Sequence, residues 1–347
     1  MSAVALFEKL TTPKFGAWAR WNRELLQPTP FRVIHQHHGL QVRQYHAWSS
    51  TPKARALIFP SLINRPYVLD LGRGRSLIRA LLGWGYEVQL FDWGRPGQFD
   101  SDLGLEHFLE DRLLPAWQVA DAESRYLNLH PDAPPHLIGH CLGGVLAMLA
   151  AGRRAPHARL TLITTPVDPM AEGADQDTLL QAWAKHPSFD FRQLGRQLAT
   201  IPWPILQASF QLLRPMAQLQ RWRSGPQIWS DPSQRDAWLQ MEVWANDAVS
   251  VPGELIADLI EHVYRDRSLM KSQPSGSWRG VRQLRGEVHA LIAQDDHIVP
   301  ESCASAIEQL LPLANVQVHR VRGGHLGALL SRRSRNEVWP RIWATEP

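Results

Sequence analysis

Short apolar runs alternate with amphipathic, helix-like stretches along most of this 347-residue chain. The apolar runs have the length of buried strands, and they lie at residues 54–60, 87–92, 136–140, 160–164, 288–293 and 316–321. The helix patterns follow them, at residues 76–84, 103–128, 143–151, 301–311 and 326–344. Consecutive parallel strands need a crossover connection, which is usually a helix. The alternation therefore predicts an α/β fold, with a mostly parallel sheet and helices on both faces.

The N-terminal part of the chain precedes this alternation. Residues 31–37 and 40–47 mix polar and apolar positions on either side of His38 and Gly39, a pattern that predicts a β-hairpin. Residues 5–27 have a helical pattern. We therefore expect residues 1–30 to form a helical segment ahead of the sheet.

A long stretch in the middle of the chain has no strand pattern. Between residues 166 and 280 only helical patterns occur, including 204–222 and 252–268. An α/β core that stops and later resumes indicates an insertion. We expect a helical cap at 166–280, inserted into a core formed by residues 1–165 and 281–347.

The charge of the chain excludes some functions. The formal net charge is +4, which suits an anionic small-molecule ligand, although an ordinary solvated surface accounts for it equally well. Lys and Arg do not form a stripe interleaved with aromatic residues, so we expect no nucleic-acid partner. Gly72 and Gly74 lack the following Lys-Ser/Thr of a phosphate-binding loop.

The cysteine count and the hydropathy pattern bear on location. Only two cysteines occur, Cys141 and Cys303, which argues against a disulfide framework and for a reducing compartment. The N-terminus has no basic region followed by an apolar run, and no uncharged apolar stretch is long enough to cross a bilayer. We expect a cytoplasmic protein without a transmembrane segment. Packing in a helix is the simplest role for Cys303.

The residues from Gly139 to Gly143 read Gly-His-Cys-Leu-Gly and lie between a predicted strand and a predicted helix. This G-x-C-x-G pattern has the position of the nucleophile elbow in an α/β-hydrolase fold. The N-terminus of the following helix would point its free N–H groups at the sulfur and favour the thiolate. Cys141 is therefore the candidate nucleophile. His140 could tune it, or could simply be a packed residue at the strand end.

The partners that a nucleophilic cysteine needs occur in the expected order. An acid should follow a later strand and a histidine the last strand, and Asp296 and His325 both have these positions. His325 would take the proton from Cys141, and Asp296 would orient His325 or activate an acceptor hydroxyl. Asp295 is the alternative acid.

Two backbone N–H groups are candidates for binding the oxyanion. One belongs to Leu142, directly after the nucleophile, and the other belongs to the loop after the strand 54–60, where Ile63 is the best candidate. A cysteine in place of serine also has a consequence. Exchange between a thiol and a thioester is close to isoenergetic, so an acyl-cysteine keeps most of the donor's activation. Acyl transfer to an alcohol is therefore favoured over hydrolysis.

Several segments together resemble the polyhydroxyalkanoate (PHA) synthases. The resemblance runs from about residue 54 to the C-terminus, and it rests on the segments 60–71, 75–81, 91–94, 139–144, 164–168, 296–300 and 324–327. The Asn64-Arg-Pro-Tyr67 run and the short chain are most similar to the two-subunit, class III enzymes. The resemblance implies an acyltransferase that polymerises 3-hydroxyacyl-coenzyme A and releases coenzyme A.

The same resemblance implies roles, ligands and partners. Cys141 would carry the growing chain as a thioester, with His325 as base and Asp296 as the acid that helps activate the incoming hydroxyl. His297 and Asn64 would contact substrate, although a structural role in a turn accounts for His297 equally well. Coenzyme A thioesters would be substrates and coenzyme A a product, so neither a cofactor nor a metal is expected. A non-catalytic second subunit, a homodimer through the cap and attachment to the surface of PHA granules are also implied.

The chain departs from the family pattern in two places. His140 and Leu142, on either side of the nucleophile, differ from the residues expected of class III. The cap matches poorly over 170–250 and better over 250–271. A thioesterase or PHA depolymerase on the same scaffold, a synthase-like enzyme with another acyl acceptor, and a granule scaffold with a vestigial site remain alternatives. The monomer length and the residues that hold coenzyme A stay open.

Overall fold

The computed structural model covers the α/β core and parts of the inserted region. The residues that it describes are 26, 28–72, 74–97, 100, 102–171, 190–202, 232–245, 247 and 249–344. The helices expected at 5–27 and 204–222 lie outside the described residues, apart from Leu26.

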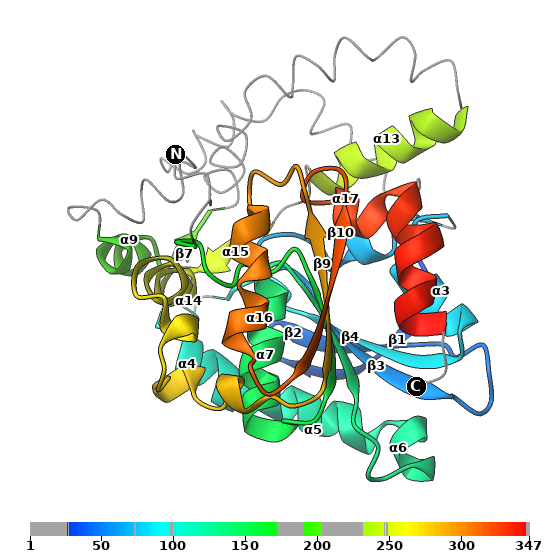
Figure 1. Ribbon diagram of the computed structural model, residues 1–347, viewed down its shortest axis with the longest axis horizontal. Coiled ribbons are helices and arrows are strands. Elements are labelled where there is room, and N and C mark those ends of the chain that lie inside the picture. Colours follow the sequence, from blue (N-terminus) through cyan, green and yellow to red (C-terminus); the bar gives the residue numbers. More distant parts are fainter. Residues whose placement is uncertain are drawn as a thin grey trace.

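One sheet of eight strands forms the centre of the described structure, in the order β1-β2-β4-β3-β5-β6-β9-β10 (Figure 1). The strands are β1 Phe31–His37, β2 Leu40–Tyr45, β3 Ala54–Phe59, β4 Tyr86–Asp92, β5 His136–His140, β6 Arg159–Ile163, β9 Glu287–Ala293 and β10 Asn315–Val321. β1 pairs antiparallel with β2, and β2 with β4, whereas all the other neighbours are parallel. The predicted hairpin and mostly parallel sheet are confirmed.

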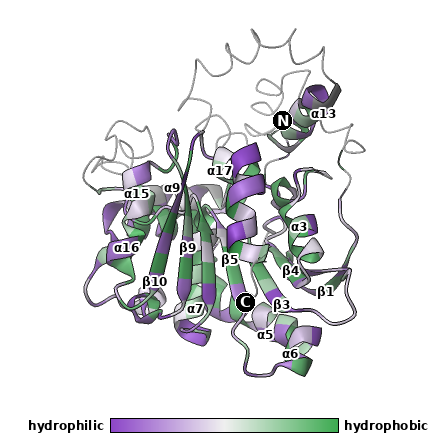
Figure 2. Ribbon diagram, turned by 45° about the vertical axis from the view of Figure 1, so that its right-hand side comes forward, coloured by the Kyte–Doolittle hydropathy of each residue, from purple (hydrophilic) through white to green (hydrophobic). Residues whose placement is uncertain are grey.

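Burial follows the position of each strand in the sheet. Every residue of β3 and β5 is buried, because helices cover both faces of a parallel sheet at its centre. β10 lies at the edge, and only its last residue is fully buried. Figure 2 shows this contrast, with green along the central strands and more purple on β10. Continuous apolar runs therefore marked the central strands in the sequence.

Helices pack on both faces of the sheet, as the sequence predicts. One face is covered by α5 Leu114–Ala122, α7 Leu142–Arg154, α14 Gly253–Leu259, α15 Glu301–Ser305 and α16 Ile307–Leu310. The other face is covered by α3 Leu77–Gly83, α17 Gly327–Leu330 and two closing helical segments, Ser334–Val338 and Pro340–Ala344. Each set buries its own apolar cluster against the sheet. No helix in the described ranges is long and apolar enough to span a membrane.

Three helices predicted as continuous are interrupted. The stretch 103–128 contains α4 Leu105–His107, a wider π-helical segment Phe108–Leu113, α5, and then α6 Arg125–Leu129. Ser124 separates the last two, since its hydroxyl accepts a hydrogen bond from the N–H of Leu127 and donates one to the buried carboxylate of Glu87. A capping serine held by a strand side chain ends one helix and begins the next. The prediction of one helix here was wrong.

The other two interruptions lie near the C-terminus. The helix predicted at 301–311 is divided between α15 and α16, and the closing helix predicted at 326–344 is divided after α17. Ser331 there has an extended backbone, with ψ at 155°. Its hydroxyl accepts a hydrogen bond from the N–H of Ser334 and so starts the next helical segment. Apolar periodicity continues across such breaks, which is why the pattern predicted single helices.

The inserted region contains a feature that the helical prediction did not include. α9 Phe191–Leu198, α13 Pro232–Ala245 and α14 are helical, but β7 Thr200–Ile201 pairs antiparallel with β8 Val251–Pro252. α9 and α14 approach closely, because a Cβ on Gly195 would lie 2.7 Å from the carbonyl oxygen of Gly253. The cap is therefore not purely helical in its described part. Its boundaries at 166 and 280 stay a prediction.

Candidate active site

Cys141 occupies a sharp turn between β5 and α7. Its backbone has φ 54° and ψ −127°, a conformation that residues other than glycine rarely adopt. Strain of this kind persists only where the surrounding structure enforces it, and it concentrates at functional sites. The turn leaves the cysteine 9% exposed at the N-terminus of α7. This is the elbow that the sequence predicts.

Two glycines after the cysteine allow the elbow to form. A Cβ on Gly143 would lie 2.2 Å from the carbonyl oxygens of both Phe59 and Pro60, and a Cβ on Gly144 would lie 1.9 Å from the hydroxyl of Thr165. Contacts this short exclude any side chain at either position. The absence of a Cβ lets the start of α7 lie directly against the end of β3, where the candidate oxyanion loop begins.

His325 and Asp296 meet beside this elbow. The Nδ1 of His325 is hydrogen-bonded to Oδ2 of Asp296 at 2.7 Å, and the side chains are 13% and 0% exposed. The other carboxylate oxygen of Asp296 accepts hydrogen bonds from the N–H groups of Ile298 and Val299, at 2.9 and 3.1 Å. Both oxygens of the acid are therefore occupied, and its orientation is fixed.

The charge state of His325 depends on its neighbours. Burial lowers the pKa of His325, but the charge on Cys141, hydrogen bonds to Asp296 and Cys141, and the charge on Asp296 outweigh it. The net result raises the pKa of His325 from 6.5 to about 10. His325 is therefore an imidazolium at neutral pH, next to the sulfur.

The alternative acid, Asp295, has a different position. Its side chain is exposed, and its carboxylate accepts a hydrogen bond from the N–H of Gly323 at 3.0 Å. Its own N–H donates to the carbonyl of Gly323, also at 3.0 Å. Asp295 thus ties its loop to the loop that carries His325, while Asp296 contacts the imidazole. The geometry favours Asp296 over Asp295 as the partner of the histidine.

For the remaining predicted site residues, the structure gives a position and a degree of burial. Leu142 is the first residue of α7 and is 7% exposed, and Ile63 is 8% exposed in the loop after β3. Asn64 is half-buried beside Ile63, whereas His297 is exposed next to Asp296. The oxyanion role of Leu142 and Ile63 stays a prediction, and so does the substrate role of Asn64 and His297.

Two side chains at the site were given no firm role by the sequence. Tyr264 follows α14, and burial, then the charges of Cys303, Cys141 and Asp296, hold the pKa of its phenol well above the usual range. No sequence motif distinguishes this tyrosine from a helical core residue. It is therefore a neutral phenol within electrostatic range of Cys141 and Asp296.

His140 is the second of these side chains. It is 2% exposed, its ring centroid lies 5.7 Å from that of His325, and neither ring nitrogen has a hydrogen-bond partner within the described protein. Burial, followed by the charge of His325, lowers the pKa of His140 to about 3. It therefore stays neutral beside the charged His325. Its position before the cysteine was the only signal in the sequence.

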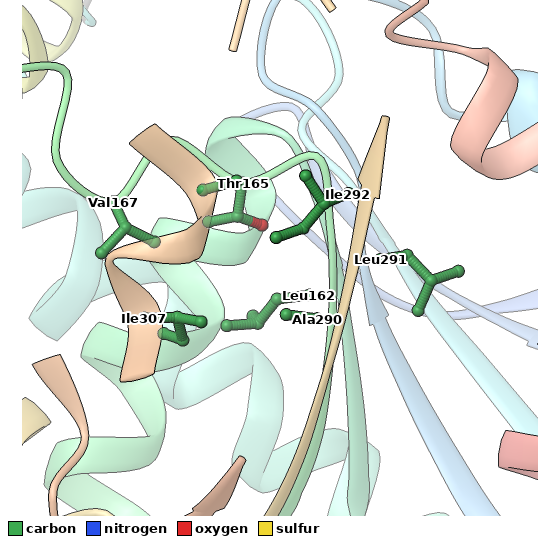
Figure 3. A pocket seen from close by; sticks show the side chains of 8 residues that line it. Leu162, Thr165, Val167, Ala290, Leu291, Ile292 and Ile307 are labelled. Carbon is green, nitrogen blue, oxygen red and sulfur yellow. The ribbon is translucent and has the colours of Figure 1, made fainter. Parts of the chain in front are cut away.

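A small cavity lies beneath the loop that follows β6 (Figure 3). Leu162, Thr165 and Ile292 are among the residues that line it. Its volume of about 10 Å³ is close to the minimum for a single water molecule. An acyl chain does not fit, so this cavity is not the substrate site.

Comparison with known proteins agrees with the fold. The family model described as "alpha/beta hydrolase fold" matches residues 73–330, which is more than half of the chain. The chain belongs to the α/β-hydrolase fold family. Among solved structures, this hydrolase is similar to the monoacylglycerol lipase of Paleococcus ferrophilus, with a TM-score of 0.50, 16% identity, and coverage of 87% of this chain and 98% of that one. At that identity the likeness concerns the fold alone.

Two relatives with similar sequences carry the same name. The poly(3-hydroxyalkanoate) polymerase subunit PhaC of Allochromatium vinosum is 27% identical over 328 residues, which cover 92% of this hydrolase and 89% of that protein. The subunit of the same name from Haloferax mediterranei is 24% identical over 327 residues, and the chain spans 64% of its length. The resemblance to PHA synthases that the sequence predicts is confirmed.

Proposed function

We propose that this α/β hydrolase is an acyltransferase that polymerises 3-hydroxyacyl-coenzyme A into poly(3-hydroxyalkanoate). The observation that carries the proposal is the strained Cys141 elbow beside the His325–Asp296 pair. The name shared by its relatives supplies the substrate class. Neither alone is sufficient, since the elbow is common to many hydrolases and the relatives are only distantly similar.

The first half of the reaction loads the enzyme. The Cys141 thiolate attacks the thioester carbonyl, and the N–H groups of Leu142 and Ile63 bind the resulting oxyanion. Collapse of the tetrahedral intermediate breaks the carbon–sulfur bond to coenzyme A. The leaving thiolate takes a proton from the His325 imidazolium and departs as the thiol. An acyl-cysteine and a neutral His325 remain.

The second half transfers the chain. The neutral His325 takes the proton from the 3-hydroxyl of an incoming 3-hydroxyacyl-coenzyme A, and the hydroxyl oxygen attacks the acyl-cysteine carbonyl. An ester forms, the Cys141 thiolate is released, and His325 is an imidazolium again. The lengthened coenzyme A thioester then acylates Cys141 as before, so one coenzyme A is released for each unit added.

Asp296 has one of its two expected roles in this scheme. Its side chain is fully buried, and its oxygens are bonded to His325, Ile298 and Val299. We therefore assign it the orientation of His325, together with stabilisation of the imidazolium, rather than direct contact with the acceptor hydroxyl.

We also infer the partners and the location of this chain from its relatives. Because the relatives are named as subunits, we propose that the chain works with a non-catalytic second synthase subunit. A homodimer through the cap and residence at the surface of cytoplasmic PHA granules complete the proposal. No cofactor or metal takes part in the steps above.

The decisive experiment measures coenzyme A release and product together. The purified chain, with and without a candidate partner subunit, is supplied with short and medium 3-hydroxyacyl-coenzyme A thioesters. We expect one coenzyme A for each hydroxyacyl unit incorporated into polymer. Free hydroxy acid as the sole product would replace this proposal with a thioesterase.

A pair of cysteine variants tests the nucleophile. Cys141→Ala should abolish coenzyme A release while leaving the circular dichroism spectrum unchanged. Cys303→Ala is the matched control, because its thiol is buried in α15 and has no role in the proposed steps. Turnover that persists in Cys141→Ala would remove the assignment of Cys141. A complete absence of turnover in the wild-type chain with every thioester would favour a granule scaffold.

A further inference from the structure

A cluster of arginines lies on two loops that lead away from the site. Arg75 belongs to the connection between β3 and α3, which also contains the candidate oxyanion residue Ile63. Arg332 and Arg335 follow α17, which begins two residues after His325. The two loops are tied together by the guanidinium of Arg335. The cluster is thus built from the same two connections that position the reactive groups.

The anchoring of Arg335 is specific. Its Nη1 donates a hydrogen bond to the carbonyl of Gly74, and its Nε donates to the carbonyl of Leu330 at 3.1 Å. These bonds make the arginine a clamp between the two loops, and both of them go to backbone carbonyls, which carry no compensating charge. Arg75, the neighbour of Gly74, is half-buried, whereas Arg332 is exposed.

The charges in this cluster repel one another. Burial, then the charge of Arg335, lowers the pKa of Arg75, and burial, then the charge of Arg332, lowers the pKa of Arg335. In the described part of the structure no carboxylate is paired with any of these three arginines. Arg333 differs, since its Nε lies 3.3 Å from Oε2 of Glu337. Like charges held together without an acid need a compensating anion.

We propose that Arg75, Arg332 and Arg335 bind the phosphate groups of the coenzyme A thioester. This inference rests on the proposed function, and it assigns the part of the substrate that the catalytic groups do not contact. In coenzyme A a long pantetheine arm separates the thioester from the phosphates, so the phosphates should bind away from the sulfur. Guanidinium groups suit phosphate because they donate two hydrogen bonds in a plane.

The distance along the chain agrees with such a placement. Arg332 is seven residues after His325, so even an extended chain separates them by no more than about 25 Å. Gly72, in the same loop as Arg75, lies against α13, since its Cβ would be 2.9 Å from the amide nitrogen of Gln240. The loop that carries Arg75 therefore lies against the inserted region. The phosphate contacts come from side chains here, because the loop glycines do not form a phosphate-binding loop.

The test compares substrates with and without phosphates. The double variant Arg75→Ala/Arg332→Ala leaves the Arg335 clamp intact and should raise the KM for a 3-hydroxyacyl-coenzyme A roughly 10- to 100-fold, with kcat nearly unchanged. The KM for the matching 3-hydroxyacyl-pantetheine, which has no phosphate, should change less than twofold. Arg333→Ala is the matched control, because it removes an equally exposed charge that already has a partner.

A binding measurement separates this inference from the proposed function. Isothermal titration of coenzyme A into Cys141→Ala needs no turnover, and it should show binding that the added Arg75→Ala/Arg332→Ala changes abolish or weaken at least tenfold. Equal affinity with and without the two arginines would overturn the phosphate site, even if polymerisation were confirmed. An equal rise in KM for the coenzyme A thioester and the pantetheine thioester would also overturn the phosphate site. Binding that depends on the arginines would stand even if the product proved to be free acid.

Discussion

Replacing Cys141 by alanine should change the titration of His325, not only the activity. The sulfur is the largest of the influences that raise the pKa of His325, and Asp296 supplies the rest against the opposing effect of burial. In the Cys141→Ala variant, His325 stays buried and keeps its contact with Asp296, whereas the charge and the hydrogen bond of the sulfur disappear. The imidazolium should therefore lose its proton at a lower pH than in the wild-type protein.

The size of the effect follows from the geometry of the pair. A pKa of about 10 instead of 6.5 means that the folded protein favours the imidazolium by about 5 kcal/mol, at about 1.4 kcal/mol for each pH unit. An opposite charge in contact typically accounts for about 1 to 3 pH units. Cys141→Ala should accordingly lower the midpoint of the His325 titration by about 1 to 3 pH units. The imidazole of the variant then loses its proton at a pH where the wild type keeps it.

Nuclear magnetic resonance of 15N-histidine-labelled protein measures this directly. The chain has 15 histidines, so His325→Gln identifies the relevant signal by its loss. Between pH 6 and 9 the wild-type His325 nitrogens should keep the shifts of an imidazolium, whereas those of Cys141→Ala should move toward neutral values. A wild-type midpoint near 6.5, or equal midpoints in both proteins, would refute the ion pair and the proton transfers built on it.

Three further substitutions test the elbow and its surroundings. Gly143→Ala should cost at least about 1–3 kcal/mol of unfolding free energy in urea titrations, because its Cβ would lie 2.2 Å from the rigid carbonyl oxygen of Pro60. Asp296→Asn should reduce coenzyme A release by about 10³- to 10⁴-fold, as expected when a histidine loses its orienting carboxylate, while Asp295→Asn should retain at least a tenth of the activity; equal losses would contradict the assignment of the acid. His140→Phe should unfold at a higher urea concentration, since it removes two buried polar atoms without protein partners, each of which costs about 1–3 kcal/mol; an unchanged or lower midpoint would show that the ring is satisfied.

The strands were predictable because their physical signal is local. Apolar runs marked the strands β3, β4, β5, β6 and β9 to within about a residue at each end, since a strand covered on both faces must be apolar throughout. The ends of the helices could not be predicted from the sequence, because they depend on contacts with residues far away in the chain. Ser124 ends a helix only because Glu87 of another strand holds it. The short β7–β8 pair in the cap has too few residues to leave a pattern.

The reactive groups were predictable for a related reason. Cys141, Asp296 and His325 each come within a few residues of the end of a strand, and the carboxyl ends of parallel strands meet at one edge. The choice between Asp295 and Asp296 needed coordinates, because adjacent residues leave a turn in different directions. The structure was also needed to find Tyr264 and His140 at the site, since burial beside a charged group is a property of the packed protein.

Backbone contacts assemble this site, and side chains decide its chemistry. The glycines of the elbow and the loop clamp made by Asp295 involve main-chain atoms, and they would serve a serine as well as a cysteine. The side chains proposed to decide the chemistry are therefore Cys141, the highly basic His325 beside it, and three arginines without a carboxylate partner among the described residues. The sulfur favours a thioester as donor, and the arginines favour a donor that carries phosphate. Within the proposed function both features fit a coenzyme A thioester, and because they share no residue, different substitutions test them.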